Sequence, residues 1–352
     1  MNTAFHPGKV WLDTKGERIQ AHGGSIFYLD NTYYWYGENK EFTDEEKGIW
    51  HWGVRCYASK DLYNWEDKGL IIPPEPDNPE SSLHPSACMD RPHIIYNART
   101  KKYVCWLKIM NKDQTQSETV LTADNFLGPY TKVKEGLRPL GMSAGDFDLA
   151  VAPDGKAYYF FERVHSETII ADLTDDYTDV TGYYSTHFVR HRPPFVREAT
   201  AHFVKDDKHY LITSGTTGYY PNPSEVAVAE TWHGPYTVLG NPHPDDATRT
   251  SYHSQVSSVF KVPGRKDLYI ALADRWVPQG TDTLDYNVYG PVVEMLSNPN
   301  APKDKIPYDV LASMPKTDTR VADYVWLPIR FDGDMAYIDW KDEWRVEDYP
   351  EE

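Results

Sequence analysis

Pairs of short aromatic and β-branched segments recur along the whole chain, and each pair is joined by a polar turn such as LDNT, PDGK or KDDK. The pairs begin near residues 26, 94, 149, 203 and 259, which are 68, 55, 54 and 56 residues apart. Long segments with helical periodicity are missing. A repeated unit of this kind is typical of a propeller blade. We therefore predict an all-β protein, a five-bladed β-propeller.

Further strand-like segments follow most of these pairs, so each repeat holds enough strands for a complete blade. The peptide GPYT occurs twice, at residues 128–131 and 234–237, and supports true repetition. Proline-rich stretches lie inside the repeats, so none of them is a linker between domains. We expect one domain over residues 1–352, with blades at roughly 15–75, 85–135, 140–190, 195–245 and 250–345.

The charge and the aromatic content narrow the classes of ligand. Asp and Glu total 53 against 36 Lys and Arg, which gives a formal charge of −17. Such a field repels nucleic acid and anionic lipid, so we expect neither as a partner. Aromatic residues make up 14% of the chain, which hints at carbohydrate, although aromatic packing in a β-core explains as much. The oligomeric state stays open.

The cysteines and the N-terminus bear on the compartment. Cys56, Cys88 and Cys105 have neither the spacing of a zinc site nor that of a disulfide framework, so we expect them to be buried as small apolar residues. The opening residues MNTAFHPGKVWLD lack the features of a signal peptide. We expect a cytoplasmic protein, or a secreted or periplasmic one if a leader has been removed.

Polar residues stand immediately before the first segment of every repeat, where the innermost strand of a blade would begin. Side chains at these positions converge on a propeller axis, so they are the candidates for a functional site. They are His22, Asp90, Arg91, Asp146, Asp148, Arg197, Glu198, His253 and Gln255. Glu198 stands out because it precedes the inner-strand sequence ATAHFV, and an ion pair with Arg197 is the alternative to a functional role.

Several of these segments resemble glycoside hydrolase family 43. REATAHF followed by HYLITS is similar to the EAP-x-F…YYL segment of that family, and YASKDLYNWEDKG is similar to its SSKDL-x-NW segment. More narrowly, QAHGGSIFYLDNTYYWYGENKE, MDRPHIIYN, GDFDLAVAPDGKAYY and SYHSQVSSVF resemble its exo-β-1,3-galactanases and β-1,3-galactosidases. The resemblance runs in order from about residue 20 to 345 and implies a five-bladed propeller with a central pocket.

The resemblance also implies hydrolysis of glycosides with inversion, by an acid, a base and a third carboxylate that tunes the acid. It implies Glu198 as the general acid and Asp146 as the carboxylate that raises its pKa. Most family members carry the base in a first-blade aspartate, but residues 22–25 here read HGGS. The galactanase subfamily shares this loss, and Gln255 is expected to orient the attacking water in its place. Asp90 is the rival base.

Other residues are expected to bind the sugar. Glu38 is expected to accept hydrogen bonds from sugar hydroxyls, with simple pairing to Lys40 as the alternative, and Asp90 is expected to hold the sugar. Trp276 and Trp326 are candidate stacking rings, for which core packing is the alternative. The remaining binding candidates are His22, Arg91, Asp148 and His253.

Metal chemistry is a minor alternative. His22, His202 and His253 could hold a single structural cation on the axis, but isolated histidines are more often hydrogen-bonded structural residues. We therefore expect no metal site and no cofactor.

Together these features predict an inverting, exo-acting hydrolase that releases galactose from the non-reducing end of β-1,3-linked galactan oligosaccharides. The alternatives within the family are an α-L-arabinofuranosidase or a β-xylosidase, both of which normally use the first-blade aspartate that this chain lacks. A carbohydrate-binding propeller without turnover is the alternative from another class.

Overall fold

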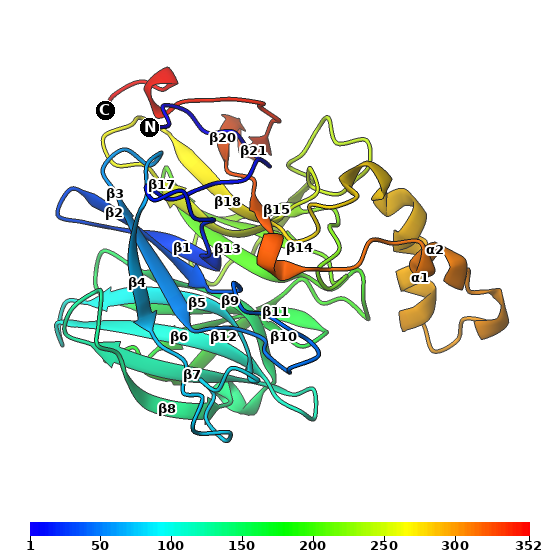
Figure 1. Cartoon of the computed structure of the whole chain (residues 1–352), viewed down its shortest axis with the longest axis horizontal. Helices are drawn as coiled ribbons and strands as arrows, with labels where there is room; N and C mark the ends of the chain where they lie inside the picture. Colours follow the sequence, from blue (N-terminus) through cyan, green and yellow to red (C-terminus); the bar gives the residue numbers. More distant parts are fainter. The chain divides into compact units, whose positions relative to one another are not determined.

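The computed structural model describes residues 1–352, and its strands form five sheets (Figure 1). Each sheet takes its strands in chain order, with neighbours paired. The first sheet holds β1 (His22–Leu29), β2 (Thr32–Glu38), β3 (Val54–Ser59) and β4 (Glu66–Ile72); the second β5 (Cys88–Asn97), β6 (Lys102–Met110), β7 (Gln116–Ala123) and β8 (Thr131–Leu137); the third β9 (Ala144–Val151), β10 (Ala157–Arg163), β11 (Glu167–Leu173) and β12 (Val180–His187); the fourth β13 (Glu198–Lys205), β14 (Lys208–Ser214), β15 (Glu225–Ala229) and β16 (Thr237–Gly240); and the fifth β17 (Gln255–Lys261), β18 (Tyr269–Arg275), β19 (Asp323–Tyr324), β20 (Leu327–Asp332) and β21 (Met335–Ile338). The prediction of an all-β, five-bladed propeller is confirmed.

The chain divides into two compact units, a division that the sequence did not indicate. The first three sheets belong almost entirely to the first unit, and the last two sheets belong to the second. The first unit comprises Met1–Ala4, Val10–Val164 and Ile169–Ser185, and the second comprises Phe5–Lys9, His165–Thr168 and Thr186–Glu352.

Local turn chemistry explains why the first two strands of a blade pair. Asp30 and Asn31 have φ of 49° and 55° between the paired residues Leu29 and Thr32. Asp206 and Asp207, with φ of 51° and 61°, make the same connection between β13 and β14. Two consecutive residues with positive φ form the turn that matches the twist of a hairpin, and Asp and Asn tolerate this conformation.

The repeated GPYT peptide makes the same contacts in two blades. The Tyr130 hydroxyl donates to the Phe126 carbonyl at 2.9 Å, and the Tyr236 hydroxyl donates to the Trp232 carbonyl at 3.2 Å. The repetition seen in the sequence is therefore a repetition of structure.

Apolar side chains of adjacent sheets pack into two cores in the first unit. The first and second sheets share one core, which contains the fully buried Cys56 and Cys105, and the second and third sheets share another. The burial expected of these two cysteines is confirmed, whereas Cys88 is only partly buried. Phe126 contacts four aromatic rings of the first core, so many of the aromatic residues serve packing.

The second unit carries the two α-helices, α1 (Tyr286–Ser297) and α2 (Tyr308–Ala312), in an insertion between β18 and β19. In Figure 1 both helices lie apart from the sheets of this unit. The sequence analysis found no long helical segment, and the 12-residue helix α1 shows that this prediction is wrong for residues 286–297. The Gly290–Pro291 pair, which usually marks a turn, lies inside this 12-residue helix. No helix has the length and apolar character needed to cross a bilayer.

Candidate active site

The predicted site residues lie at or near the beginnings of the first strands of the blades. His22, Glu198 and Gln255 are the first residues of β1, β13 and β17. Asp90 is the third residue of β5, and Asp146 is the third residue of β9.

Three of these strand starts share a backbone irregularity that the sequence did not indicate. The pairing register shifts directly after His22, Asp90 and Glu198. The next residue has positive φ in each case: Gly23 at 62°, Arg91 at 54° and Ala199 at 49°. Such bulges redirect side chains and concentrate at functional sites.

Six charged residues of the first unit form a buried network in which carboxylates and cations alternate. Lys40 Nζ lies 2.9 Å from Glu38 Oε2 and 3.4 Å from Asp90 Oδ1. Lys108 Nζ lies 3.3 Å from Asp90 Oδ2 and 2.9 Å from Asp146 Oδ1. The network therefore connects Glu38, Asp90 and Asp146, three of the predicted site residues.

Arg91 closes this network. Its guanidinium lies 2.9 Å from Asp146 Oδ2, and its backbone N–H donates to Glu38 Oε1 at 2.9 Å. Three carboxylates therefore share three cations, and this neutrality permits so many charges to be buried. The sequence analysis gave pairing of Glu38 with Lys40 as the alternative to sugar binding, and this pairing is observed.

The surroundings set the protonation states. Burial alone would raise the pKa of Asp146, but Arg91 and Lys108 lower it to about 2. Burial opposes ionisation of Asp90 as well, yet Lys108 and Lys40 hold its pKa below the usual value. Burial raises the pKa of Glu38 to about 7, against the effect of Lys40. At neutral pH Asp90 and Asp146 are ionised, and Glu38 is close to its titration point.

Two further positions of the first unit, Asp148 and Gly23, lie beside residues of the candidate site. Asp148 Oδ1 lies 3.4 Å from Nε2 of His93, whose pKa burial lowers to about 4, so this contact joins a carboxylate to a neutral imidazole. A Cβ atom at Gly23 would lie 2.4 Å from Glu38 Oε1. An aspartate at position 23 would therefore have to displace Glu38.

The second unit holds Glu198 and Gln255 in direct contact. Gln255 Nε2 donates to Glu198 Oε1 at 3.4 Å and to the Ser214 hydroxyl at 2.8 Å. Trp276 Nε1 donates to the side-chain oxygen Oε1 of Gln255 at 3.3 Å. Both ends of the carboxamide are therefore fixed, with its nitrogen shared between Ser214 and the acid.

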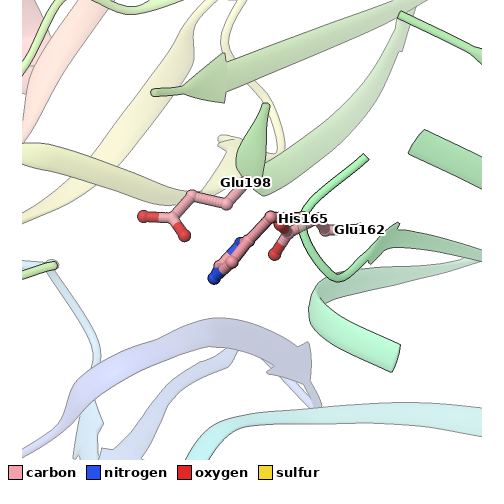
Figure 2. A group of neighbouring side chains, drawn as sticks. All are labelled: Glu162, His165 and Glu198. Atoms are coloured by element: carbon pink, nitrogen blue, oxygen red, sulfur yellow. The ribbon is translucent and has the colours of Figure 1, made fainter. Parts of the chain in front are cut away.

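His165 is a further neighbour of Glu198 (Figure 2). One of its ring nitrogens lies within 4.8 Å of a Glu198 carboxylate oxygen, and both residues belong to the second unit. Glu162, also drawn in Figure 2, lies three residues earlier in the chain, near the end of β10.

Arg197 and Asn222 support the backbone around the acid. The Arg197 guanidinium donates to the Thr213 side chain and carbonyl at 3.0 and 2.8 Å, and its nearest carboxylate is that of Glu225 at 3.5 Å. The Asn222 side chain accepts from Gly215 N–H at 2.6 Å and donates to the Gly215 carbonyl at 2.8 Å. These contacts hold the end of β14, where Ser214 lies, against the start of β13.

Two predicted stacking rings are enclosed by protein. Trp326 is 1% exposed, its ring centroid lies 6.0 Å from that of Phe5, and its carbonyl accepts from Trp344. The prediction that Trp326 stacks on sugar is corrected, because it is a core residue. Trp276 packs on Tyr219 at 5.1 Å and contacts Gln255 through its indole N–H.

The three histidines considered as ligands of a cation are His22, His202 and His253, and each has a different environment. His202 Nε2 lies 3.2 Å from His209 Nδ1, and Trp232 packs against both rings. This partner removes His202 from the predicted cation site. His22 is fully buried in the first unit, and His253, in the second unit, donates its backbone N–H to Thr250 Oγ1 at 3.2 Å.

Lys108, Ser214 and His165 were missed by the sequence analysis. Regular extension of the predicted hairpin would pair Asp90 with Ile109, and only the register shift after Asp90 brings Lys108 opposite it. The register shift after Glu198 likewise brings Ser214, rather than Gly215, opposite the acid. Nothing in the local sequence VHSET marks His165.

Comparison with known proteins identifies the family. The sequence model of glycosyl hydrolases family 43 matches residues 19–287, which extend over both units. The chain is similar to the solved structure of a GH43 β-1,3-galactosidase, with 30% identity and a TM-score of 0.80, over 99% of this chain and 65% of that one. It therefore spans slightly less than two thirds of that protein's length.

Two further structures are similar. A GH43 β-1,3-galactosidase solved with galactodeoxynojirimycin has 26% identity and a TM-score of 0.76, over 97% of this chain and 100% of that one. An exo-β-1,3-galactanase from Clostridium thermocellum has 26% identity and a TM-score of 0.74, over 97% of this chain and 66% of that one. No curated protein sequence matches. The extent of the family match shows that the chain belongs to glycosyl hydrolases family 43.

Proposed function

We propose that the protein is an inverting, exo-acting glycoside hydrolase that releases galactose from the non-reducing end of β-1,3-linked galactan oligosaccharides. The observation that carries the proposal is the pairing of Glu198 with the Gln255 carboxamide, combined with the lack of room for an aspartate at Gly23. The similarity to two proteins described as β-1,3-galactosidases and to one described as an exo-β-1,3-galactanase supports the choice of substrate.

Glu198 is the proposed general acid. It protonates the glycosidic oxygen as the bond to the anomeric carbon breaks, while a water molecule attacks that carbon from the opposite face. Gln255 donates to Oε1 of Glu198, and this contact supports the position of the acid. The attacking water passes its proton to bulk water when Gln255 orients it, or to the Asp90 carboxylate when Asp90 is the base, and galactose leaves as the α-anomer.

Asp146 is the proposed carboxylate that tunes the acid. Arg91 and Lys108 hold it ionised throughout the neutral range. A fixed negative charge raises the pKa of an acid on which it acts and so keeps that acid protonated near neutrality.

Gln255 and Asp90 are the two candidates for the group that activates the water. The predicted role of Gln255 in orienting the water stays a prediction. Its contact with Glu198 supports a second role, as a positioning residue for the acid, since inverting enzymes usually separate acid and base by about 6.5–9.5 Å. Asp90, ionised and held by two lysines, remains the rival base.

Glu38 and Asp90 are also the proposed acceptors for sugar hydroxyl groups, together with donors from Arg91 and Lys108. The alternation of acceptors and donors in this network suits a neutral, polyhydroxylated ligand. The reaction needs only water and these side chains, so we propose no cofactor.

Turnover on a panel of substrates tests the proposal. The wild type is assayed on β-1,3-galactobiose and on aryl galactoside, arabinofuranoside and xyloside, beside Glu198→Gln and the exposed control Glu230→Gln. We expect galactose from galactobiose in the wild type and the control only. Cleavage of arabinofuranoside or xyloside alone would support the alternative family activities, and binding without turnover would indicate a carbohydrate-binding protein.

A further inference from the structure

A cavity of about 610 Å³ lies in the first unit, at the end of the second sheet where β5 begins and β6 ends. Its walls come from residues 79–82 and 86–88, from residues 109–115 and 117 around the turn between β6 and β7, and from residues 135–136 of β8. Sites for small ligands have volumes of roughly 300–1,000 Å³. The cavity is therefore of ligand size, and none of the residues assigned above lines it.

The cavity is continuous with the strands that carry the buried charge network. Cys88, in its wall, precedes Asp90 by two residues in β5, and Met110 follows Lys108 by two residues in β6. Cys88 pairs with Met110, and Asp90 pairs with Lys108. Residues two apart in a strand lie on one face about 7 Å apart, so the cavity begins one step beyond the network.

Four charged residues line the cavity, Glu80, Lys112, Asp113 and Glu135. The Glu135 carboxylate accepts from the Ser82 backbone N–H at 2.6 Å and from Lys132 at 3.2 Å. The Asp113 carboxylate accepts from the Thr115 hydroxyl at 2.6 Å and from its N–H at 3.0 Å. With three carboxylates and one ammonium group among its lining residues, the wall disfavours an anionic ligand.

Hydroxyl and apolar groups make up much of the remaining wall. The hydroxyl of Ser82 is buried without a hydrogen-bond partner, and an unsatisfied buried hydroxyl is unfavourable unless a ligand or water completes it. Ile109, Met110 and Ala87 add apolar surface. Hydroxyl groups beside apolar carbon surface match the edges and the C–H faces of a sugar ring.

We propose that this cavity binds sugar residues of the galactan chain beyond the residue that is released. The inference rests on the proposed function, which it deepens by adding an extended-substrate site in the second blade. It predicts that longer β-1,3-galactan oligosaccharides bind there and that free galactose does not.

Cys88 provides a native reporter for the cavity. Cys56 and Cys105 are 0% exposed, whereas Cys88 is partly exposed and lines the cavity. Alkylation by iodoacetamide is followed by mass spectrometry in Glu198→Gln, in which turnover is blocked, and Cys88→Ser identifies the reporter signal. Saturation with β-1,3-galactotetraose at about ten times its Kd should slow alkylation about tenfold, and galactose should not. Equal rates with and without the tetraose would overturn the proposal.

A matched pair of variants tests the same site in the active enzyme. Ala87→Trp places a large ring at the cavity wall, and Asp77→Trp places the same ring on an exposed part of the same loop. We expect the KM for galactotetraose to rise about tenfold in Ala87→Trp, equivalent to about 1.4 kcal/mol, and to stay at the wild-type value in Asp77→Trp. An equal KM in both variants would contradict the proposal.

The two proposals fail separately. If the wild type cleaves galactobiose but the tetraose does not protect Cys88, the cavity site is rejected and the proposed function stands. If the tetraose protects Cys88 but the wild type never cleaves galactobiose, the proposed function is rejected and the cavity is supported as a sugar site.

Discussion

Replacing Lys40 with Met tests whether the buried charge network is as interdependent as its geometry indicates. The Lys40 side chain is 1% exposed, and its Nζ lies 2.9 Å from Glu38 Oε2, 3.4 Å from Asp90 Oδ1 and 3.3 Å from the Trp50 carbonyl. Methionine preserves the length and most of the volume of the side chain. Lys40→Met therefore removes the charge and leaves two carboxylates with one cation fewer.

The expected loss of stability at neutral pH is about 3–5 kcal/mol, the usual effect of removing one partner from a buried ion pair. The loss should depend on pH through Glu38, whose pKa burial raises from 4.5 to about 7 and which loses an opposing cation in the variant. A carboxyl group with a raised pKa binds its proton more tightly when folded, so the wild type itself loses stability as the pH rises from 4.5 to about 7. Without Lys40 the pKa of Glu38 rises further, so the additional loss in the variant appears as the pH rises above 7. Lys40→Met should therefore be less damaging at pH 5 than at pH 8.

Urea denaturation followed by circular dichroism at both pH values provides the measurement. Lys47→Met is the matched control, because Lys47 makes an exposed ion pair with Asp44 at 2.7 Å, and exposed pairs contribute little. A loss in Lys40→Met no larger than that in Lys47→Met, or an equal loss at pH 5 and pH 8, would refute the reasoning.

Three further predictions concern catalysis. Glu198→Gln should slow cleavage of galactobiose by about 10²–10⁴-fold and cleavage of an aryl galactoside with a good leaving group by much less, and equal losses would reject its role as the acid. Asp146→Asn should move the basic limb of the pH–rate profile to lower pH, because the acid loses a charge that raises its pKa, and an unchanged profile with full activity would remove Asp146 from the site. Asn222→Ala, which breaks both bonds to Gly215, should lower kcat more than it changes KM on galactobiose, whereas a loss confined to thermal stability would make the residue merely structural.

The architecture was predictable because each blade is built from strands that are neighbours in sequence. The LDNT and KDDK turns favour their own hairpins through residues that accept positive φ, so spacing alone revealed five blades. The starts of the first strands were predictable for the same reason. Helix α1 was not expected, and it forms around the Gly290–Pro291 pair because Tyr286 and Tyr289 pack against the apolar cluster that contains Trp276.

The chemistry within the site was predictable only in part. The sequence identified Glu198, Asp90 and Asp146, but pKa values depend on burial and on cations brought in by neighbouring strands. Lys108 reaches Asp146 from another blade, and no local pattern announces that contact. The positive φ of Arg91 and of Ala199 was likewise not readable from residue types that rarely adopt it.

The anomeric form of the first sugar released from β-1,3-galactobiose tests the central claim most directly. Proton NMR spectra recorded before mutarotation should show α-galactose appearing at the rate of hydrolysis in the wild type and no release in Glu198→Gln. First-formed β-galactose, or no galactose at all from the wild type, would contradict the account.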